Sequence, residues 1–273
     1  MSVLYVVGTP IGNLNDFSPR AIETLEKVDF IAAEDTRVTL KLLNHFCIKK
    51  EMVSYFEHNK LQRGEIITNR ILNGETCAIV TDAGMPCVSD PGELLIMQCE
   101  EKGIPTIVIP GPTAFASALA ISGLPTGRFT FEGFLSVNKK SRKEHLESLI
   151  NEERTMLFYE APHKLSNTLK DFANYFPNRK LSIVREITKI HEEVIRTTTD
   201  KAYEDYGETG LKGEIVLVLG GKPHKEEEEK YTLSDAVEMA KKLIENGEKA
   251  TTASKEIASL TGFKKNEIYK ELL

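Results

Sequence analysis

The first half of the chain alternates short apolar runs with segments of helical periodicity, and this alternation restricts the fold more than any other feature. Runs rich in Val, Ile and Ala occupy residues 3–7, 30–33, 52–55, 77–81 and 106–109. Helical patterns lie between them, near 19–28, 38–46, 61–72, 92–102 and 114–121. Continuous apolar strands are typical of a sheet that helices cover on both faces. We therefore expect an α/β domain with a mostly parallel sheet over residues 1–121.

The order of predicted strands and helices changes after about residue 123. Strand-like runs follow at 129–134, 155–159, 181–185, 193–198 and 214–219, with helical patterns near 141–150 and 163–175. Two of these runs succeed each other without a helix between them, which indicates a mixed sheet. The predicted fold is thus α/β with two α/β domains, residues 1–121 and 122–221, and a cleft between them.

The rest of the chain is predicted to be a linker and a helical extension. Glycine, proline and a run of glutamates at 222–230 are typical of a solvated acidic linker. Helical patterns near 233–246, 251–260 and 265–273 then predict a small extension over 231–273 that resembles a helix-turn-helix. We find no apolar run long enough to span a membrane and no secretory signal. The 4 cysteines are widely spaced, which fits a cytoplasmic protein and argues against a zinc site.

Three loops follow predicted strands of the first half. Gly8-Thr9-Pro10-Ile11-Gly12 can approach a ligand closely, but it matches neither the dinucleotide nor the phosphate-loop spacing. The stretch 81–92 contains two aspartates, two glycines and two prolines, and 110–114 is rich in small residues. Ligands of open α/β sheets bind beyond the carboxyl ends of the strands. The three loops are therefore predicted to line one ligand site, although each alone could also be a structural turn.

Charged residues gather at three further strand ends. Each group is costly to bury unpaired, so these side chains must pair with one another or with a ligand. They are Glu34, Asp35 and Arg37, then Glu57 and His58, and finally Arg185, Glu186 and Lys189. Taken together, the three groups favour a shared cleft.

The net charge of −6 argues against tight, purely electrostatic binding of nucleic acid. Local basic stretches nevertheless exist. Lys139, Lys140, Arg142 and Lys143 form one, and the terminal helices carry several lysines. Both stretches are candidate RNA contacts, although a solvated face explains the first better, and a dimer-packing or domain-packing role explains the second equally well.

Five ordered motifs together resemble a known family. They are Val-Gly-Thr-Pro-Ile-Gly-Asn-Leu at 7–14, Ala-Glu-Asp-Thr-Arg at 33–37, Thr-Asp-Ala-Gly-Met-Pro-x-x-Ser-Asp-Pro-Gly at 81–92, Pro-Gly-Pro-Thr-Ala at 110–114 and Arg-Glu-Ile-Thr-Lys at 185–189. In this order they resemble the bacterial ribosomal small-subunit RNA 2′-O-methyltransferase I family, which belongs to the tetrapyrrole methylase superfamily. The resemblance spans about residues 3–221.

The resemblance implies a methyltransferase that uses S-adenosylmethionine, yields S-adenosylhomocysteine and needs no metal. It also implies a homodimer that methylates the ribose 2′-hydroxyl of a cytidine in the decoding region of 16S ribosomal RNA. Carried over by position, the contacts to the methyl donor fall at Pro10, Ile11, Asp82, Ala83, Gly84, Cys87, Thr113, Ala114 and Glu160. The first loop departs from the Gly-x-Gly-Pro-Gly-Asp of tetrapyrrole-specific members, which favours the RNA branch and leaves the contact at Pro10 or Ile11 open.

A catalytic hypothesis follows from the charged strand ends. A ribose hydroxyl is a weak nucleophile at neutral pH, so a positioned base would accelerate its attack. His58 or Asp35 is the candidate base. Arg37 and Lys189 would hold a backbone phosphate or the developing alkoxide, and Glu186 would orient Lys189.

Two alternatives differ in substrate or in class. A methyltransferase of the same fold could act on a tetrapyrrole or on a side chain of a translation factor. A non-enzymatic regulator could read nucleic acid through the terminal helices, but it would leave the strand-end loops without a role. Binding of S-adenosylmethionine separates an enzyme from a regulator. The sequence leaves open whether the substrate is naked RNA or the assembled small subunit, and which surface forms the dimer.

Overall fold

The computed structural model describes residues 2–223 and 232–272. Contacts divide the chain into two compact units, Met1–Lys222 and Pro223–Leu273. The predicted acidic linker at 222–230 lies almost entirely outside the described residues. Within the described residues, no helix is long and apolar enough to cross a membrane.

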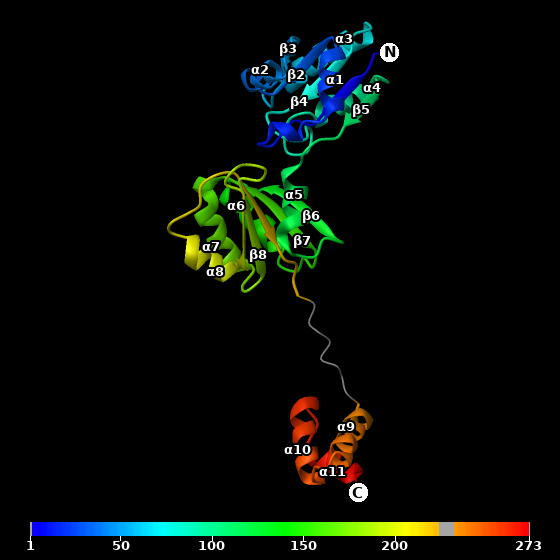
Figure 1. Ribbon diagram of the computed structural model, residues 1–273, viewed down its shortest axis with the longest axis vertical. Helices are drawn as coiled ribbons and strands as arrows, with labels where there is room; N and C mark the ends of the chain where they lie inside the picture. The colour runs from blue at the N-terminus through cyan, green and yellow to red at the C-terminus, as the bar shows by residue number, and fades with distance from the viewer. Residues whose placement is uncertain (1, 224–231, 273) are drawn as a thin grey trace. The chain divides into compact units, whose positions relative to one another are not determined.

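The first sheet of the larger unit is parallel throughout. Its strands are β1 (Leu4–Val7), β2 (Phe30–Ala33), β3 (Glu51–Ser54), β4 (Cys77–Val80) and β5 (Thr106–Ile109). They lie in the order β3-β2-β4-β1-β5, and every neighbouring pair is parallel (Figure 1). The predicted parallel sheet is confirmed, and its five carboxyl ends consequently lie along one edge.

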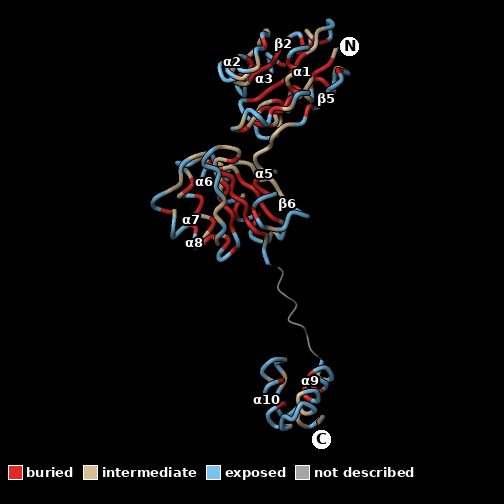
Figure 2. Tube along the Cα trace, viewed as in Figure 1, coloured by how far each residue is buried: buried red, intermediate tan, exposed pale blue. Residues whose placement is uncertain are grey.

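Helices cover both faces of this sheet, as the continuous apolar strands require. On one face α1 (Pro19–Lys27) and α2 (Thr36–His45) bury Leu25 and Leu43 against Ile31. On the other face α3 (Lys60–Leu72) and α4 (Glu93–Glu101) bury Ile67 and Leu95 against Phe30. Strands β2 and β4 are buried throughout, whereas the edge strands β3 and β5 are mostly half-buried or exposed (Figure 2).

The second sheet is mixed, as predicted. Its strands are β6 (Phe129–Phe134), β7 (Thr155–Glu160), β8 (Lys180–Arg185), β9 (Glu193–Thr198) and β10 (Ile215–Leu219), in the order β6-β7-β10-β8-β9. Strands β6 and β7 are parallel, whereas the other neighbouring pairs are antiparallel. One face packs on α6 (Lys139–Ser148), α7 (Leu165–Tyr175) and α8 (Thr199–Tyr206) through Leu146, Phe172 and Ala202.

Helix α5 (Ala114–Ser122) connects the two sheets. It begins after β5 of the first sheet, but its buried residues Ala118 and Leu119 pack with Leu157 and Val216 on the other face of the second sheet. Gly123 ends the helix in the left-handed conformation, at φ +79°, which glycine adopts without steric cost. The proposed domain division between 121 and 122 therefore falls in the last turn of a helix that belongs to the second core.

The smaller unit is the predicted helical extension. It contains α9 (Leu233–Glu245), α10 (Ala250–Thr261) and α11 (Lys265–Glu271). Thr232 and Asp235 form a capping box at the start of α9, and Gly262 ends α10 with a positive φ of +78°. Ala240, Ile257 and Ile268 contribute to a core of its own.

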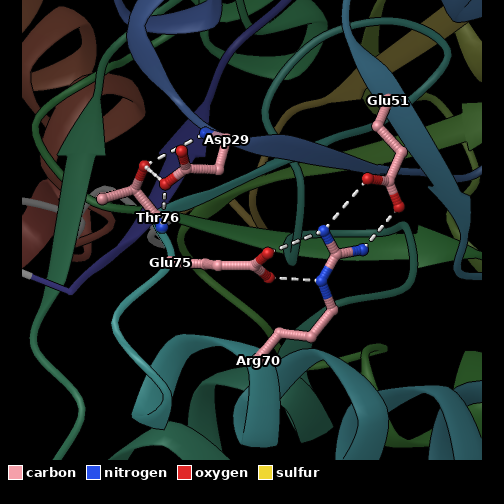
Figure 3. A network of polar contacts seen from close by, with 5 residues as sticks. All are labelled: Asp29, Glu51, Arg70, Glu75 and Thr76. Atoms are coloured by element: carbon pink, nitrogen blue, oxygen red, sulfur yellow. Dashed lines mark hydrogen bonds and ion pairs between the residues drawn. The ribbon is translucent and has the colours of Figure 1, made fainter.

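A polar network closes the amino-terminal edge of the first sheet (Figure 3). Arg70 on α3 donates to both carboxylate oxygens of Glu51 at 2.6 and 3.1 Å and also pairs with Glu75. Its guanidinium lies 3.7 Å from the ring centroid of Phe30. Beside it, Asp29 accepts from the backbone N–H and the hydroxyl of Thr76, each at 2.7 Å. One arginine thus ties α3 to the starts of β2, β3 and β4.

We expect Arg70→Ala to lower the free energy of unfolding by about 1–2 kcal/mol, because it removes several charge-assisted hydrogen bonds and a cation–π contact at once. Denaturant titration measures this loss. Lys27→Ala is the control, since its pair with Glu23 is exposed and should contribute less than about 0.5 kcal/mol. Equal losses in the two variants would contradict the role given to the network.

Candidate active site

A cavity of about 480 Å³ lies at the carboxyl edge of the first sheet and extends to the second sheet of the same unit. The first sheet contributes Ile11 after β1, Glu34 after β2, most of residues 81–90 after β4, and Thr113 and Ala114 after β5. The second contributes Phe134, Ile187, residues 159–162 and residues 214–216. Its volume is that of a pocket for a ligand of small-molecule size.

Strand direction explains why these residues meet. All carboxyl ends of a parallel sheet lie at one edge, so the loops after β1, β2, β4 and β5 converge there. In the second sheet β10 runs antiparallel to β7 and pairs Ile215 with Glu160. The beginning of β10 therefore lies beside the end of β7, and both line the cavity.

Close backbone packing joins three loops at the cavity. A Cβ on Gly8 would lie 2.7 Å from the Cα of Gly111, and a Cβ on Gly111 would lie 2.8 Å from the Cα of Gly8. The loop after β1 is also bonded to the loop after β4, because Thr9 and Gly84 exchange backbone hydrogen bonds of 2.9 and 3.1 Å. Gly84 has a positive φ of +89°. Only glycine lets these backbones approach in this way.

A second contact joins the loop after β1 to the turn after β8. Ile11 packs in one apolar cluster with Ile187. A Cβ on the neighbouring Gly12 would lie 2.7 Å from Lys189 Cγ and 2.9 Å from Thr188 Oγ1. Glu186 and Thr188 both have positive φ, 51° and 66°, so this turn is conformationally restricted. The first loop therefore contacts both walls of the cavity.

Carboxylates dominate the charge of the cavity wall. Glu34 accepts from the Thr81 hydroxyl at 2.6 Å, and Asp82 accepts from the Asp35 backbone N–H at 3.1 Å. Burial, together with the charges of Glu34 and Asp82, raises the pKa of Asp90 to about 6, although a hydrogen bond with Thr81 opposes the shift. Burial and Glu34 also raise the pKa of Asp82. None of the described residues that line the cavity is Lys, Arg or His.

The second sheet contributes a buried carboxylate and a tyrosine. Glu160 is 5% exposed; one of its oxygens accepts from the Ala161 N–H at 2.8 Å and the other accepts from the Thr168 hydroxyl. The Tyr159 hydroxyl accepts from the Phe115 N–H at 3.3 Å, at the start of α5. These bonds fix both side chains at the cavity wall.

The structure brings most of the predicted donor contacts together. Ile11, Asp82, Ala83, Gly84, Thr113, Ala114 and Glu160 all line the cavity. Pro10 lies next to the wall in sequence but does not line it. Cys87 has a positive φ of 70° and packs towards Gly92, and burial raises the pKa of its thiol to about 11.

The predicted catalytic residues lie around the cavity rather than in its wall. Asp35 accepts from the backbone N–H and Nε of Arg37 at 2.8 and 3.0 Å, and these bonds lower the pKa of Asp35 to about 2. The Arg37 side chain is 87% exposed. His58 is exposed in the segment after β3, the edge strand whose loop does not reach the cavity.

The remaining two predicted catalytic residues form one ion-pair group. Lys189 Nζ lies 2.9 Å from Glu186 Oε1 and 3.0 Å from Glu214 Oε2. Its partial burial opposes ionisation, but the two carboxylates raise the pKa of Lys189 overall. Glu214 lines the cavity, so Lys189 lies one contact away from it.

Sequence reasoning placed Glu34 in a charged group at the cleft without giving it a role, and it did not select Asp90, Phe134 or Tyr159 as site residues. Glu34 and Asp90 stood inside motifs already quoted, and only their neighbours were chosen. Phe134 and Tyr159 end apolar strands and carry no local signal of a site. No cluster of three or more His, Cys, Asp and Glu that could hold a metal ion occurs in the part of the chain that the structure describes.

Known folds agree with this geometry. The family model of the tetrapyrrole (corrin/porphyrin) methylases matches residues 3–203. A uroporphyrin-III C-methyltransferase from Thermus thermophilus is similar in structure, with a TM-score of 0.58 and 20% identity over 81% of this chain and 94% of that one. A structure of a uroporphyrin-III C-methyltransferase from that organism in complex with S-adenosyl homocysteine has the same TM-score, 0.58, at 17% identity over 80% of this chain and 97% of that one.

Sequence relatives are more specific. A protein of Synechocystis named ribosomal RNA small subunit methyltransferase I is 43% identical over 99% of this chain and 97% of its own length. One of that name from Bacillus subtilis is 40% identical over 98% and 93%. The chain therefore belongs to the ribosomal RNA small subunit methyltransferase I family of tetrapyrrole methylases. The predictions of this fold and of a methyltransferase are confirmed.

A relative from Thermotoga maritima matches only part of this chain. This ribosomal RNA small subunit methyltransferase I is 45% identical over 222 residues, which are 81% of this chain and 100% of that protein. The matched length equals that of the larger unit here. About a fifth of this chain therefore has no counterpart in that protein.

We expect Gly12→Ala to weaken binding of the methyl donor by roughly tenfold, because the added Cβ must displace Lys189 or the first loop and strains a φ of +150°. Calorimetry with S-adenosylhomocysteine measures the change. Gly127→Ala is the matched control, since its Cβ would meet nothing within 4 Å. Unchanged affinity in Gly12→Ala would remove the first loop from the site.

Proposed function

We propose that the protein transfers a methyl group from S-adenosylmethionine to the ribose 2′-hydroxyl of a cytidine in the decoding region of 16S ribosomal RNA. The observation that carries this proposal is the match of nearly the whole chain to proteins named ribosomal RNA small subunit methyltransferase I. The cavity supports it, because the motifs that mark the family line one connected wall. Such a substrate places the protein in the cytoplasm.

The chemistry of the cavity fits the proposed donor. The carboxylates Glu34, Asp82 and Asp90 provide negative charge for a ligand that carries a sulfonium and an ammonium. Ala83, Gly84 and Ala114 leave room for a flat purine against the backbone. We propose that Ile11, Thr113 and Glu160 complete the donor site, with Pro10 and Cys87 supporting its loops. S-adenosylhomocysteine is the expected product.

Alignment is the main contribution that the residues make to catalysis in this proposal. Methyl transfer is an in-line displacement, and fixed orientation can supply roughly 7–11 kcal/mol of a barrier. The loops after β1, β4 and β5 are locked by backbone contacts and hold the donor in one pose. Arg37 is exposed beside Asp82 and is suited to a phosphate of the RNA backbone. Lys189, oriented by Glu186, would approach the acceptor from the opposite wall.

The assembled small subunit or its RNA is the proposed partner, and a homodimer is the proposed state. Similar structures with other names do not favour the alternative of a tetrapyrrole or a translation-factor side chain as substrate. Among similar structures, a diphthine synthase is 13% identical and the methyltransferase CobJ is 18% identical, which supports a common fold alone.

The decisive experiment is methylation of small ribosomal subunits from cells that lack the gene. Purified protein and labelled S-adenosylmethionine should place one methyl group on a ribose of 16S RNA, and mass spectrometry of nuclease fragments identifies the nucleotide. Naked 16S RNA in parallel separates the two possible substrates. Transfer to a base, or no transfer to either substrate, would contradict the proposal.

We expect Arg37→Ala to raise KM for the RNA substrate about three- to tenfold, because one phosphate contact is lost, and to leave donor affinity unchanged. Steady-state kinetics with subunits and calorimetry with the donor measure the two quantities. Arg20→Ala, an exposed arginine on α1, is the control and should change neither. A wild-type KM for Arg37→Ala would show that Arg37 does not contact the substrate.

A further inference from the structure

The cavity contains several carboxylates, but most are already engaged. Glu34 accepts from Thr81, and Asp82 accepts from the Asp35 N–H. Glu160 has a donor on each oxygen, and Glu214 pairs with Lys189. Hydrogen-bond donors and cations of this kind favour the ionised form of a carboxylate. Lys189 therefore opposes protonation of Glu214, and the Asp35 N–H together with Arg37 opposes protonation of Asp82.

Asp90 is the fifth carboxylate of the cavity wall. It lies in the loop after β4, lines the cavity and is partly buried. Its polar neighbour is the Thr81 hydroxyl, which has a single proton and donates it to Glu34 at 2.6 Å. One proton cannot serve both carboxylates at once, so Asp90 gains a full hydrogen bond there when it carries a proton itself. This contact therefore favours the protonated form of Asp90.

We propose that Asp90 is the catalytic base that takes the proton from the acceptor hydroxyl; this rests on the proposed function. As the hydroxyl oxygen bonds to the methyl carbon, its O–H bond breaks and the proton moves to a carboxylate oxygen of Asp90. The carbon–sulfur bond of the donor breaks, and its electron pair stays on sulfur. Asp90 then releases the proton to solvent.

Charge balance supports this assignment. Before transfer, the positive charge of the sulfonium offsets the carboxylates Glu34, Asp82 and Asp90. After transfer the sulfur is neutral, and without a proton the three like charges would stand uncompensated in a partly buried site. Protonation of Asp90 neutralises one carboxylate as the sulfonium loses its charge, so the net charge of the cavity is unchanged by the transfer.

The surroundings of Asp90 set its titration. Glu34 after β2 and Asp82 after β4 face it, as do the Tyr159 hydroxyl and the Cys87 thiol. No cation among the described residues contributes to the shift of its pKa to about 6. A base must be ionised to act, so kcat/KM for the donor should rise with pH through about 6 and then level off.

The first test is the rate. Asp90→Asn keeps the shape of the side chain and removes the base, so single-turnover methylation of subunits should fall by roughly 100-fold or more and lose its rise near pH 6. Asp90→Glu should recover part of the rate. Asp205→Asn on α8 is the matched control and should behave as wild type. A rate within threefold of wild type for Asp90→Asn would overturn the proposal.

The second test needs no turnover. Binding of cationic S-adenosylmethionine at pH 6 should lower the pKa of Asp90 and release up to about half a proton, whereas neutral-sulfur S-adenosylhomocysteine should release less. Calorimetry in buffers of different ionisation enthalpy measures this release, and Asp90→Asn should abolish the difference between the ligands. An unchanged difference in Asp90→Asn would overturn the assignment, even if the wild type methylated no ribosomal RNA.

Stability provides the third readout and shows that the variant folds. The pKa of Asp90 is raised on folding, so the folded state binds the extra proton between about pH 4 and 6 and loses stability as the pH rises through that range. Asp90→Asn should therefore raise Tm at pH 7.5 and not at pH 4. A Tm equal to wild type at both pH values would show that Asp90 does not interact with the carboxylates Glu34 and Asp82, and would contradict the proposal.

Discussion

The backbone contact between Gly8 and Gly111 is the constraint on which the cavity depends. It brings the ends of β1 and β5 closer than any side chain would allow, since a Cβ on either glycine would lie under 3 Å from the other backbone. The bridge between Thr9 and Gly84 adds the loop after β4 to the same assembly. Three loops from separate strands then form one wall, and Ile11 extends it to Ile187 of the second sheet. The fold therefore sets the positions of these groups before a ligand binds.

The two sheets contribute to the site for different topological reasons. Parallel strands have all their carboxyl ends at one edge, so the loops after β1, β2, β4 and β5 line the cavity, whereas the loop after the edge strand β3 does not reach it. The mixed sheet supplies its share because β10 reverses direction beside β7. A fully parallel second sheet would have sent the start of β10, with Glu214 and Ile215, to the opposite edge. The antiparallel pairing of β10 with β7 is therefore a requirement of the cavity, although the sequence indicated a mixed sheet through a different pair, β8 and β9, which have no helix between them.

Apolar runs were sufficient to predict the strands, and the pattern is clearest in β2, β4 and β10, in which every residue is buried. Helix α8 was not predicted, since only Thr199 and Ala202 of its eight residues are buried and the chain enters it directly from β9. Strand order was not visible either. That is why His58 was grouped with the site: the sequence shows that it follows a strand, but not that β3 lies at the far edge. The sequence also could not rank Asp35 against Glu34 and Asp90 as a base. The pairing of Asp35 with Arg37 and the partial burial of Asp90 are properties of the folded chain.

The acidic cavity imposes a condition on how RNA can be recognised. Carboxylates that attract a cationic donor repel phosphates, and the chain as a whole has a net charge of −6. In the proposed function, phosphate contacts therefore come from cations at the rim such as Arg37, whose own charge is partly offset by Asp35. Such an arrangement lowers the affinity for RNA of arbitrary sequence and structure. For the proposed ribose acceptor, recognition would then draw on RNA shape and on the accessibility of the nucleotide, and an assembled subunit presents both in a more fixed geometry than free RNA does.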